Sequence, residues 1–115
     1  MVSERSGGVR RDRLYWASLE PTRGSEIAKT RPVLVVSPDA MNQRVDTVVV
    51  CPLTSQLHPQ WASRVACDCD GRPSEVAVDQ IRTISKSRLG GSLGKLDAAT
   101  AAEVRAVIRL LYVEN

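Results

Sequence analysis

The chain has 115 residues, enough to bury one hydrophobic core but too few for two domains. Hydrophobic residues make up 43% and charged residues 25%, which is ordinary for a globular protein, and no apolar run approaches the ~20 residues of a membrane span. The net charge of +3 is unevenly spread: residues 1–13 carry a local +2, residues 68–79 a local −3, and residues 82–95 a local +4. This segregation permits a basic face for nucleic acid, although such runs are also typical of solvated surfaces.

The N-terminus and the cysteines narrow the class of protein further. Residues 1–10 lack periodicity and contain Gly7-Gly8, which predicts a flexible arm followed by a single domain over residues 11–115. Because this start has no apolar signal segment, we expect a cytoplasmic protein. Three cysteines cannot close a full disulfide framework, and we interpret Cys51, Cys67 and Cys69 as small apolar fillers rather than zinc ligands.

Short apolar runs separated by turn residues predict strands at 14–19, 33–36, 47–51, 63–68 and 75–84. Pro52 is predicted to end the third strand or to mark an edge, and a slip in the alternation predicts a bulge near Asp79-Gln80. A short helix is expected from Pro38, and a turn of helix over 85–89, after which the glycines of 90–94 break the chain. Asp97 caps a final helix whose apolar stripe is Val104, Val107, Ile108 and Leu111. The pattern favours a compact α+β domain with a strongly bent antiparallel sheet.

A polar loop delivers Arg31 to the start of a buried strand. Because Pro32 restricts the residue before it to extended geometry, the direction in which Arg31 enters the strand is fixed. An arginine fork held in this way is suited to gripping phosphate.

Polar residues also follow the other apolar strands, and rigid strands aim such side chains well. The set comprises Glu26, Lys29, Arg31, Thr54, Ser55, Asp79, Gln80 and Arg82. An arginine and a hydroxyl that converge on one point can hold the two non-bridging oxygens of a phosphodiester. No phosphate-binding glycine loop or metal-binding motif is present in the sequence, so we expect neither a metal nor a nucleotide cofactor.

Four segments, in this order, resemble the MazF/PemK family of toxin endoribonucleases. They are Pro-Thr-Arg-Gly-Ser-Glu at 21–26, Lys-Thr-Arg-Pro at 29–32, Pro-Leu-Thr-Ser at 52–55 and Asp-Gln-Ile-Arg-Thr-Ile at 79–84. Two positions depart from the family pattern. Arg11-Asp12-Arg13 replaces the usual Arg-Gly-Asp/Glu, and Ala77 stands where some relatives carry an extra arginine or histidine.

The resemblance implies a small SH3-like barrel that forms a homodimer, cleaves single-stranded RNA without metal, and is silenced by a cognate antitoxin. It also implies that Arg31 and Thr54 are the catalytic pair, with Glu26 as general base and Asp79 as the open alternative. Either acid can instead be a structural partner of Arg31 or Arg82, and for Asp79 we favour this structural role. The implied RNA contacts are Lys29, Ser55, Gln80 and Arg82. Trp61 either stacks on a base or packs in the fold. The runner-up functions are a non-enzymatic toxin of the same fold that poisons a protein such as gyrase, and an RNA-binding barrel without catalysis.

Overall fold

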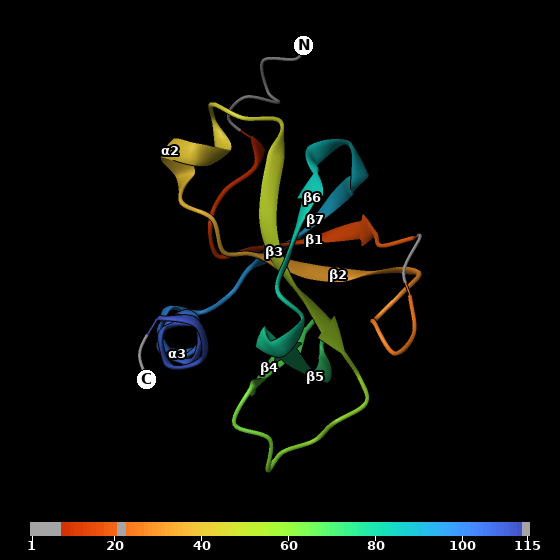
Figure 1. Ribbon diagram of the computed structural model, residues 1–115, viewed down its shortest axis with the longest axis vertical. Helices are drawn as coiled ribbons and strands as arrows, with labels where there is room; N and C mark the ends of the chain where they lie inside the picture. Colours follow the sequence, from red (N-terminus) through yellow and green to blue (C-terminus); the bar gives the residue numbers. More distant parts are fainter. Residues whose placement is uncertain (1–7, 21–22, 114–115) are drawn as a thin grey trace.

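Strand β3 (Thr47–Thr54) is the centre of the sheet in the computed structural model (Figure 1). Its valine-rich sequence is largely buried, as expected for a strand covered on both faces. One edge pairs with β2, while the other pairs first with β6 and then with β5. Because β3 changes partner along its length, the sheet curls upon itself.

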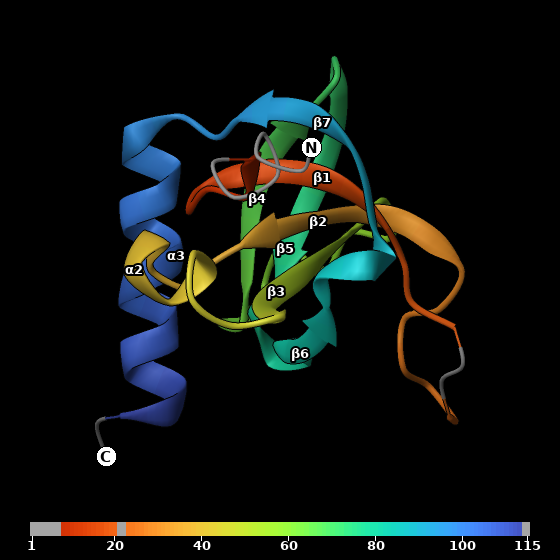
Figure 2. The same cartoon turned by 90° about the horizontal axis from the view of Figure 1, so that it is seen from above.

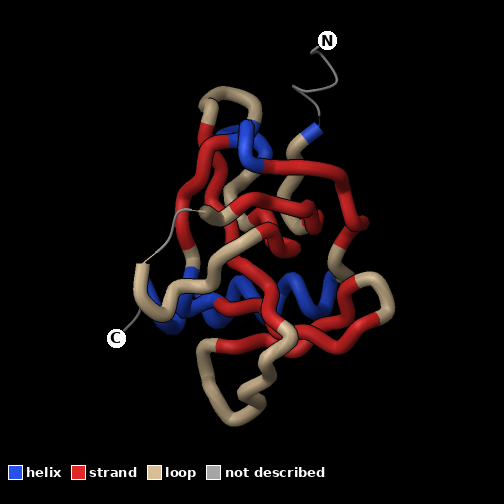
Figure 3. The backbone as a smooth tube through the Cα atoms, turned by 90° about the vertical axis from the view of Figure 1, so that its right-hand side faces the viewer, coloured by secondary structure: helices blue, strands red, loops and turns tan. Residues whose placement is uncertain are grey.

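The structure describes residues 8–20 and 23–113. The other elements are β1 (Arg13–Ser18), β2 (Thr30–Val35), α2 (Asp39–Asn42), β4 (Arg64–Cys69), β5 (Arg72–Ala77), η1 (Val78–Gln80), β6 (Arg82–Ser85), η2 (Lys86–Arg88), β7 (Leu89–Lys95) and α3 (Ala98–Tyr112). The strand order is β4-β5-β3-β2-β1-β7, with β6 beside β3, and every pairing in this part of the chain is antiparallel. Figures 2 and 3 show the strands winding into a half-barrel with α3 along one side, which confirms the α+β fold.

The prediction that Pro52 ends its strand is wrong, because β3 continues through Pro52 to Thr54. Val36 N donates to Val49 O at 2.9 Å, so the pair formed by Val33 and Pro52 is a non-hydrogen-bonded one. The missing N–H of Pro52 would therefore point to the opposite edge. At that edge β3 is changing partner from β6 to β5, and the ladder loses nothing there.

The predicted strand 75–84 is two strands, and the expected bulge is a full 3₁₀ turn, η1. The turn forms because β5 and β6 pair with different halves of β3, so the chain must step sideways between them. Val78 is buried in the core and its N–H donates to Ser63 O at 3.0 Å, which anchors the turn.

The prediction that the glycines of 90–94 break the chain is also wrong, because this segment forms β7 against β1. A Cβ at Gly90 would lie 3.4 Å from Trp16 Cβ, so the strands approach closely there. Gly94 has φ +108°, beside a register shift between Leu14 and Tyr15. Glycine is therefore used here to build an irregular edge strand.

Helix α3 covers one of two core clusters. Asp97 Oδ2 accepts from Thr100 N at 3.0 Å, which confirms the predicted cap. Val104 is buried, and Val107 and Ile108 pack on the same cluster, whereas Leu111 is 38% exposed and lies outside it. Cys51, Cys67 and Cys69 are free thiols that pack in or against this cluster, as the filler interpretation predicts. Within the described part of the chain, no helix is long and apolar enough to cross a membrane.

Most of the predicted N-terminal arm, residues 1–7, lies outside the described residues. The three residues that follow it run back over β1. Tyr15 Oη donates to Gly8 O at 2.6 Å and accepts from Arg10 N at 3.1 Å. The chain is thus tied to the sheet from Gly8 onwards.

Candidate functional site

Arg31 and Thr54 lie near the ends of two neighbouring strands. The β2–β3 ladder pairs Val35 with Val50 and ends at the pair of Val33 and Pro52. Continued by two residues, the same register would place Arg31 opposite Thr54. Because alternate residues of a strand face the same side, their two side chains would then project from one face of the sheet.

The guanidinium of Arg31 is fixed by the backbone beside it. Its Nε donates to Ala28 O at 2.8 Å, and its Cα lies opposite Ala17 in β1. No hydrogen bond from its two terminal amino groups to residues 8–20 or 23–113 is present. Arg31 therefore offers the two-pronged end that binds an oxyanion bidentately.

Thr54 is 6% exposed, and its hydroxyl is oriented by the chain that follows. Thr54 Oγ1 accepts from Gln56 N at 3.0 Å. A hydroxyl has one donor and two acceptor positions, so this bond leaves the O–H of Thr54 available to donate. The residue can thus supply one directed hydrogen bond.

A polar cleft of about 450 Å³ lies between the β1–β2 loop and the η1–β6 segment. It is lined by Ser25, Glu26, Asp79, Gln80, Ile81 and Arg82. Gln80 Oε1 accepts from Ile27 N at 2.8 Å and so ties the loop to the turn. The cleft thus brings together the predicted residues Glu26, Gln80 and Arg82 with Asp79, the alternative base. The predicted catalytic pair, Arg31 and Thr54, is not among its lining residues.

Three predicted residues are solvent-exposed: Glu26, which also lines the cleft, Lys29 and Ser55. Glu26 Oε1 accepts from Arg23 N at 3.1 Å, within its own loop. The backbone N of Lys29 donates to Glu20 Oε2 at 2.8 Å, and Lys29 has φ +70°, a left-handed conformation that reverses the chain before β2.

An ion cluster that sequence reasoning missed lies beside the cleft. Arg64 Nε donates to Asp79 Oδ1 at 3.0 Å, and its Nη1 lies 3.4 Å from Glu75 Oε1. The side chains of Arg64 and Glu75 are only 7% and 4% exposed. Asp79 therefore does have an arginine partner, but it is Arg64 rather than Arg31 or Arg82. The sequence offered one indication of this cluster, which is that an acid, Glu75, lies next to Val76 in a predicted strand.

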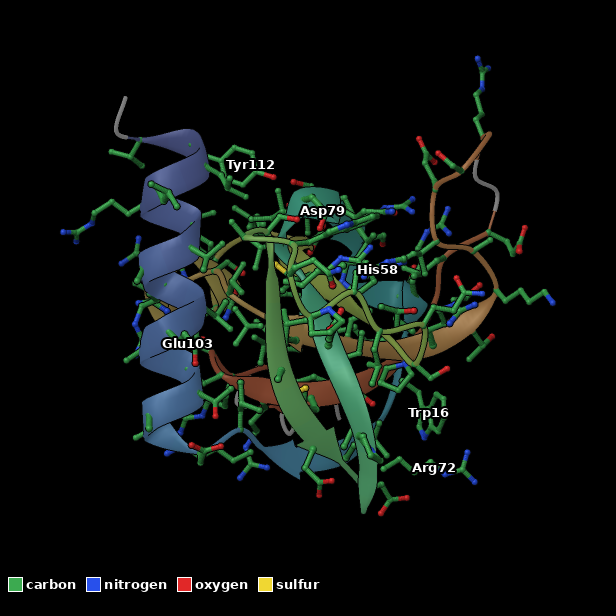
Figure 4. All side chains as sticks on the ribbon, turned by 90° about the horizontal axis from the view of Figure 1, so that it is seen from below. Trp16, His58, Arg72, Asp79, Glu103 and Tyr112 are labelled. Carbon is green, nitrogen blue, oxygen red and sulfur yellow. The ribbon has the colours of Figure 1, made fainter. Side chains whose placement is uncertain are left out.

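The β3–β4 loop (residues 55–63) is stacked on this cluster. The rings of His58 and Trp61 are parallel within 8°, with centroids 3.9 Å apart, and the guanidinium carbon of Arg64 lies 4.7 Å from the centroid of the Trp61 ring. Trp61 is still 46% exposed, so it both packs and presents surface. In Figure 4, His58 and Asp79 lie on the side of the sheet that is seen from below, between α3 and the β1–β2 loop.

The buried thiol nearest this region has no nucleophilic character at neutral pH. Burial, together with the negative charge of Asp79, raises the pKa of Cys51 to about 12. Because the thiolate is the reactive form, Cys51 is a packing residue. The chemistry of the site falls to its charged and hydroxyl side chains.

The fold and the site together define a class: a curled antiparallel half-barrel with one C-terminal helix, whose sheet presents an arginine and a threonine beside a polar cleft. A family model described as "PemK-like, MazF-like toxin of type II toxin-antitoxin system" matches residues 10–112, and the chain belongs to this family. The resemblance read from the four sequence segments is confirmed.

Relatives of known sequence and structure agree with this assignment. Endoribonuclease EndoA of Bacillus subtilis (strain 168) is 36% identical over 94 residues, which cover 77% of this chain and 81% of EndoA. Endoribonuclease MazF6 of Mycobacterium tuberculosis is 33% identical over 112 residues, covering 88% and 94%. The crystal structure of MazF (Form-I) from Deinococcus radiodurans superposes with a TM-score of 0.79 at 30% identity, covering 90% of this chain and 94% of that one.

Proposed function

We propose that this protein is a sequence-specific toxin endoribonuclease that cleaves single-stranded RNA without a metal ion. The observation that supports this most directly is the polar cleft, whose lining includes the predicted residues Glu26, Gln80 and Arg82. The β2–β3 register, continued to Arg31 and Thr54, adds to this support. The proposal also draws on the relatives named endoribonuclease.

In the proposed reaction, the ribose 2′-oxygen attacks the adjacent phosphorus while the bond from phosphorus to the 5′-oxygen breaks. The products are a cyclic phosphate and a 5′-hydroxyl, and the leaving oxygen takes its proton from water. Arg31 stabilises the charge that builds on the non-bridging oxygens, and Thr54 donates a hydrogen bond to one of them. Arginine remains protonated in proteins, so its role here is electrostatic.

Glu26 is the proposed general base, which takes the proton of the 2′-hydroxyl. One of its carboxylate oxygens has no hydrogen bond within the described residues, and the side chain lines the cleft. Asp79 is the weaker candidate, because taking up a proton would cost it the ion pair with Arg64. The measurement that separates them is the pH dependence of cleavage by Glu26→Gln and Asp79→Asn.

The proposed RNA contacts are Lys29, Ser55, Gln80 and Arg82. Gln80 and Arg82 line the cleft, and Lys29 and Ser55 are exposed at the ends of the strands that carry Arg31 and Thr54. The amide nitrogen of Gln80 makes no hydrogen bond in the described part of the chain, so it can donate to a base.

We further propose a cytoplasmic homodimer that is silenced by a cognate antitoxin. The antitoxin is supported by similarity to an endoribonuclease from a mycobacterial species in complex with its cognate antitoxin, which has a TM-score of 0.75 at 25% identity and covers 90% of this chain and 93% of that one. An acidic, partly disordered segment with apolar anchors would suit a basic groove.

The test is incubation of the purified protein with a long single-stranded RNA in excess EDTA, followed by mapping of the fragment ends. We expect discrete cuts at a short recurring motif with 5′-hydroxyl ends. Arg31→Ala should abolish cleavage while leaving the fold and the dimer intact, whereas Arg44→Ala, an exposed arginine after α2, should cut normally. Cleavage by a well-folded Arg31→Ala variant would remove Arg31 from the site, and no cleavage by the wild type would favour a toxin that binds a protein target.

A further inference from the structure

A second polar hollow, of about 320 Å³, lies where the chain enters β1. It is lined by Arg10, Arg11, Arg13, Asp39 and Lys95. We refer to its four cationic residues as the N-terminal basic cluster. One acid against four cations leaves a strong local positive charge.

The fold itself forces these cations together. Arg13 and Lys95 are directly opposite each other in the β1–β7 pair, an arrangement of like charges that destabilises a sheet. Arg11 is held in place by a hydrogen bond from its backbone N to Asp39 Oδ1 at 2.7 Å. Asp39 Oδ2 lies 3.5 Å from Arg10 Nη1. Both oxygens of the one acid are therefore already engaged.

Neighbouring acids do not relieve the charge. The Asp12 carboxylate turns to Arg105, with both oxygens 3.0 Å from its Nη1, and Asp97 caps α3. Arg11 Nε is buried and has no hydrogen-bond partner within residues 8–20 and 23–113. A buried donor without a partner is costly, so this atom indicates a missing acceptor.

We propose that the N-terminal basic cluster binds a backbone phosphate of the RNA strand, away from the phosphate that is cut. Phosphate oxygens are the acceptors that arginine and lysine groups bind best, and they would relieve the repulsion between Arg13 and Lys95. The inference rests on the proposed function, because it takes RNA to be the substrate.

A third hollow connects the cluster with the cleft. It has a volume of about 360 Å³ and shares Arg11 with the basic cluster and Ile81 with the cleft. Its wall is mostly apolar and includes Arg105, which is paired with Asp12, and Arg109. A strand bound in the cleft thus has a path along the surface to the cluster, where the departure from the family pattern at Arg13 supplies one of the cations.

The test uses 2′-O-methyl RNA, which cannot be cut, so that binding is measured independently of catalysis. Two lengths of about 4 and about 16 nucleotides span the range of common single-strand sites. The Arg13→Ala/Lys95→Ala variant should bind the long RNA more weakly, with a salt slope shallower by about 0.7 for each phosphate that the protein no longer neutralises. Binding of the short RNA should not change. The control variant is Arg44→Ala/Arg72→Ala, which removes the same charge from exposed positions elsewhere. The difference in affinity between the long and the short RNA should be the same for this variant as for the wild type.

The proposal would be overturned if Arg13→Ala/Lys95→Ala lost the same affinity for short and long RNA, or if the two double variants lost the same affinity for the long RNA. Inorganic phosphate at constant ionic strength separates the sources of the anion, because a ligand of the folded state raises the melting temperature. One outcome would overturn RNA as the occupant. In it, phosphate raises the melting temperature of the wild type but not that of Arg13→Ala/Lys95→Ala, and the loss of RNA affinity in this variant does not depend on RNA length. If the wild type binds with length dependence but does not cleave RNA, the proposed catalysis fails and this inference stands.

Discussion

The two loops beside the candidate site are held in different ways. The described residues of the β1–β2 loop are attached through separate hydrogen bonds. Gln80 Oε1 accepts from Ile27 N, Arg31 Nε donates to Ala28 O, and Arg88 Nη1 donates to Glu20 O. The β3–β4 loop (residues 55–63) is attached through buried charge. Glu75 accepts from His58 N at 2.9 and 3.0 Å and also pairs with Arg64.

This difference indicates a cleft with one adaptable wall and one rigid wall. Exposed single bonds contribute little and open readily, whereas a buried acid that accepts several bonds fixes the backbone that it contacts. We therefore expect the β1–β2 loop to adjust to RNA, while the β3–β4 loop keeps its shape.

The largest expected effect tests the rigid wall. Glu75→Ala leaves Arg64 buried with only the Asp79 carboxylate and frees the N–H of His58, so we expect a loss of about 3 kcal/mol in the free energy of unfolding. The measurement is urea denaturation. Glu103→Ala, on the exposed side of α3, is the matched control and should change stability by less than about 0.5 kcal/mol. Equal effects of the two variants would contradict the assignment of the rigid wall to Glu75.

The core beneath the rigid wall can be probed by alkaline pH. Burial raises the pKa of Cys51 from its ordinary value of 9.0 to about 12. The folded state thus holds this proton more tightly than the unfolded state, and the associated stability is complete below about pH 9 and is lost as the pH rises towards 12. Cys51 should contribute a fall of about 1.4 kcal/mol for each pH unit in this window, and burial raises the pKa of Cys67 to about 12 as well. Cys51→Ala should therefore make this part of the profile shallower by about 1.4 kcal/mol per pH unit, and an unchanged slope would place the alkaline sensitivity elsewhere.

The adaptable wall should respond differently to a change. Gln80→Ala removes the bond to Ile27 N, and we expect a loss of only about 1 kcal/mol in global stability. Trypsin should nevertheless cut faster at Arg23 and Lys29, because the loop opens locally. Gln80→Glu keeps an acceptor and should behave as the wild type, and Gln43→Ala is the control for an exposed glutamine. Unaltered proteolysis would show that Gln80 does not hold this loop.

Much of the fold follows from local sequence signals. Valine-rich runs and the Asp97 cap each act over a few residues, and the structure has both. Pro52 and the glycines of 90–94 cannot be interpreted in this way, because their meaning depends on partners distant in sequence. Pro52 is accommodated at a change of partner strand, and Gly90 at a close approach to Trp16.

The candidate site was only partly predictable from local sequence. Arg31 and Thr54 belong to a set of polar residues at strand ends, and the resemblance to the family selects them as a pair. The role of Arg64 could not be predicted, since its partners Glu75 and Asp79 are 11 and 15 residues away and are brought near only by the β4–β5 hairpin and η1. The burial of Glu75 could not be predicted either, because its alternation with Val76 and Val78 places it on the other face of the strand.

The smallest expected effect asks whether stacking adds to the rigid wall. His58 and Trp61 stack at 3.9 Å, and aromatic pairs of this kind contribute roughly 0.5–1.5 kcal/mol beyond their buried area. A double-mutant cycle with His58→Ala and Trp61→Ala isolates this coupling by urea denaturation. A coupling of about 1 kcal/mol would mean that the exposed stack stiffens the loop together with Glu75. A coupling near zero would leave the loop held by Glu75 and by the bond from Val78 N to Ser63 O, and Trp61 would then be free to change its partner when RNA binds.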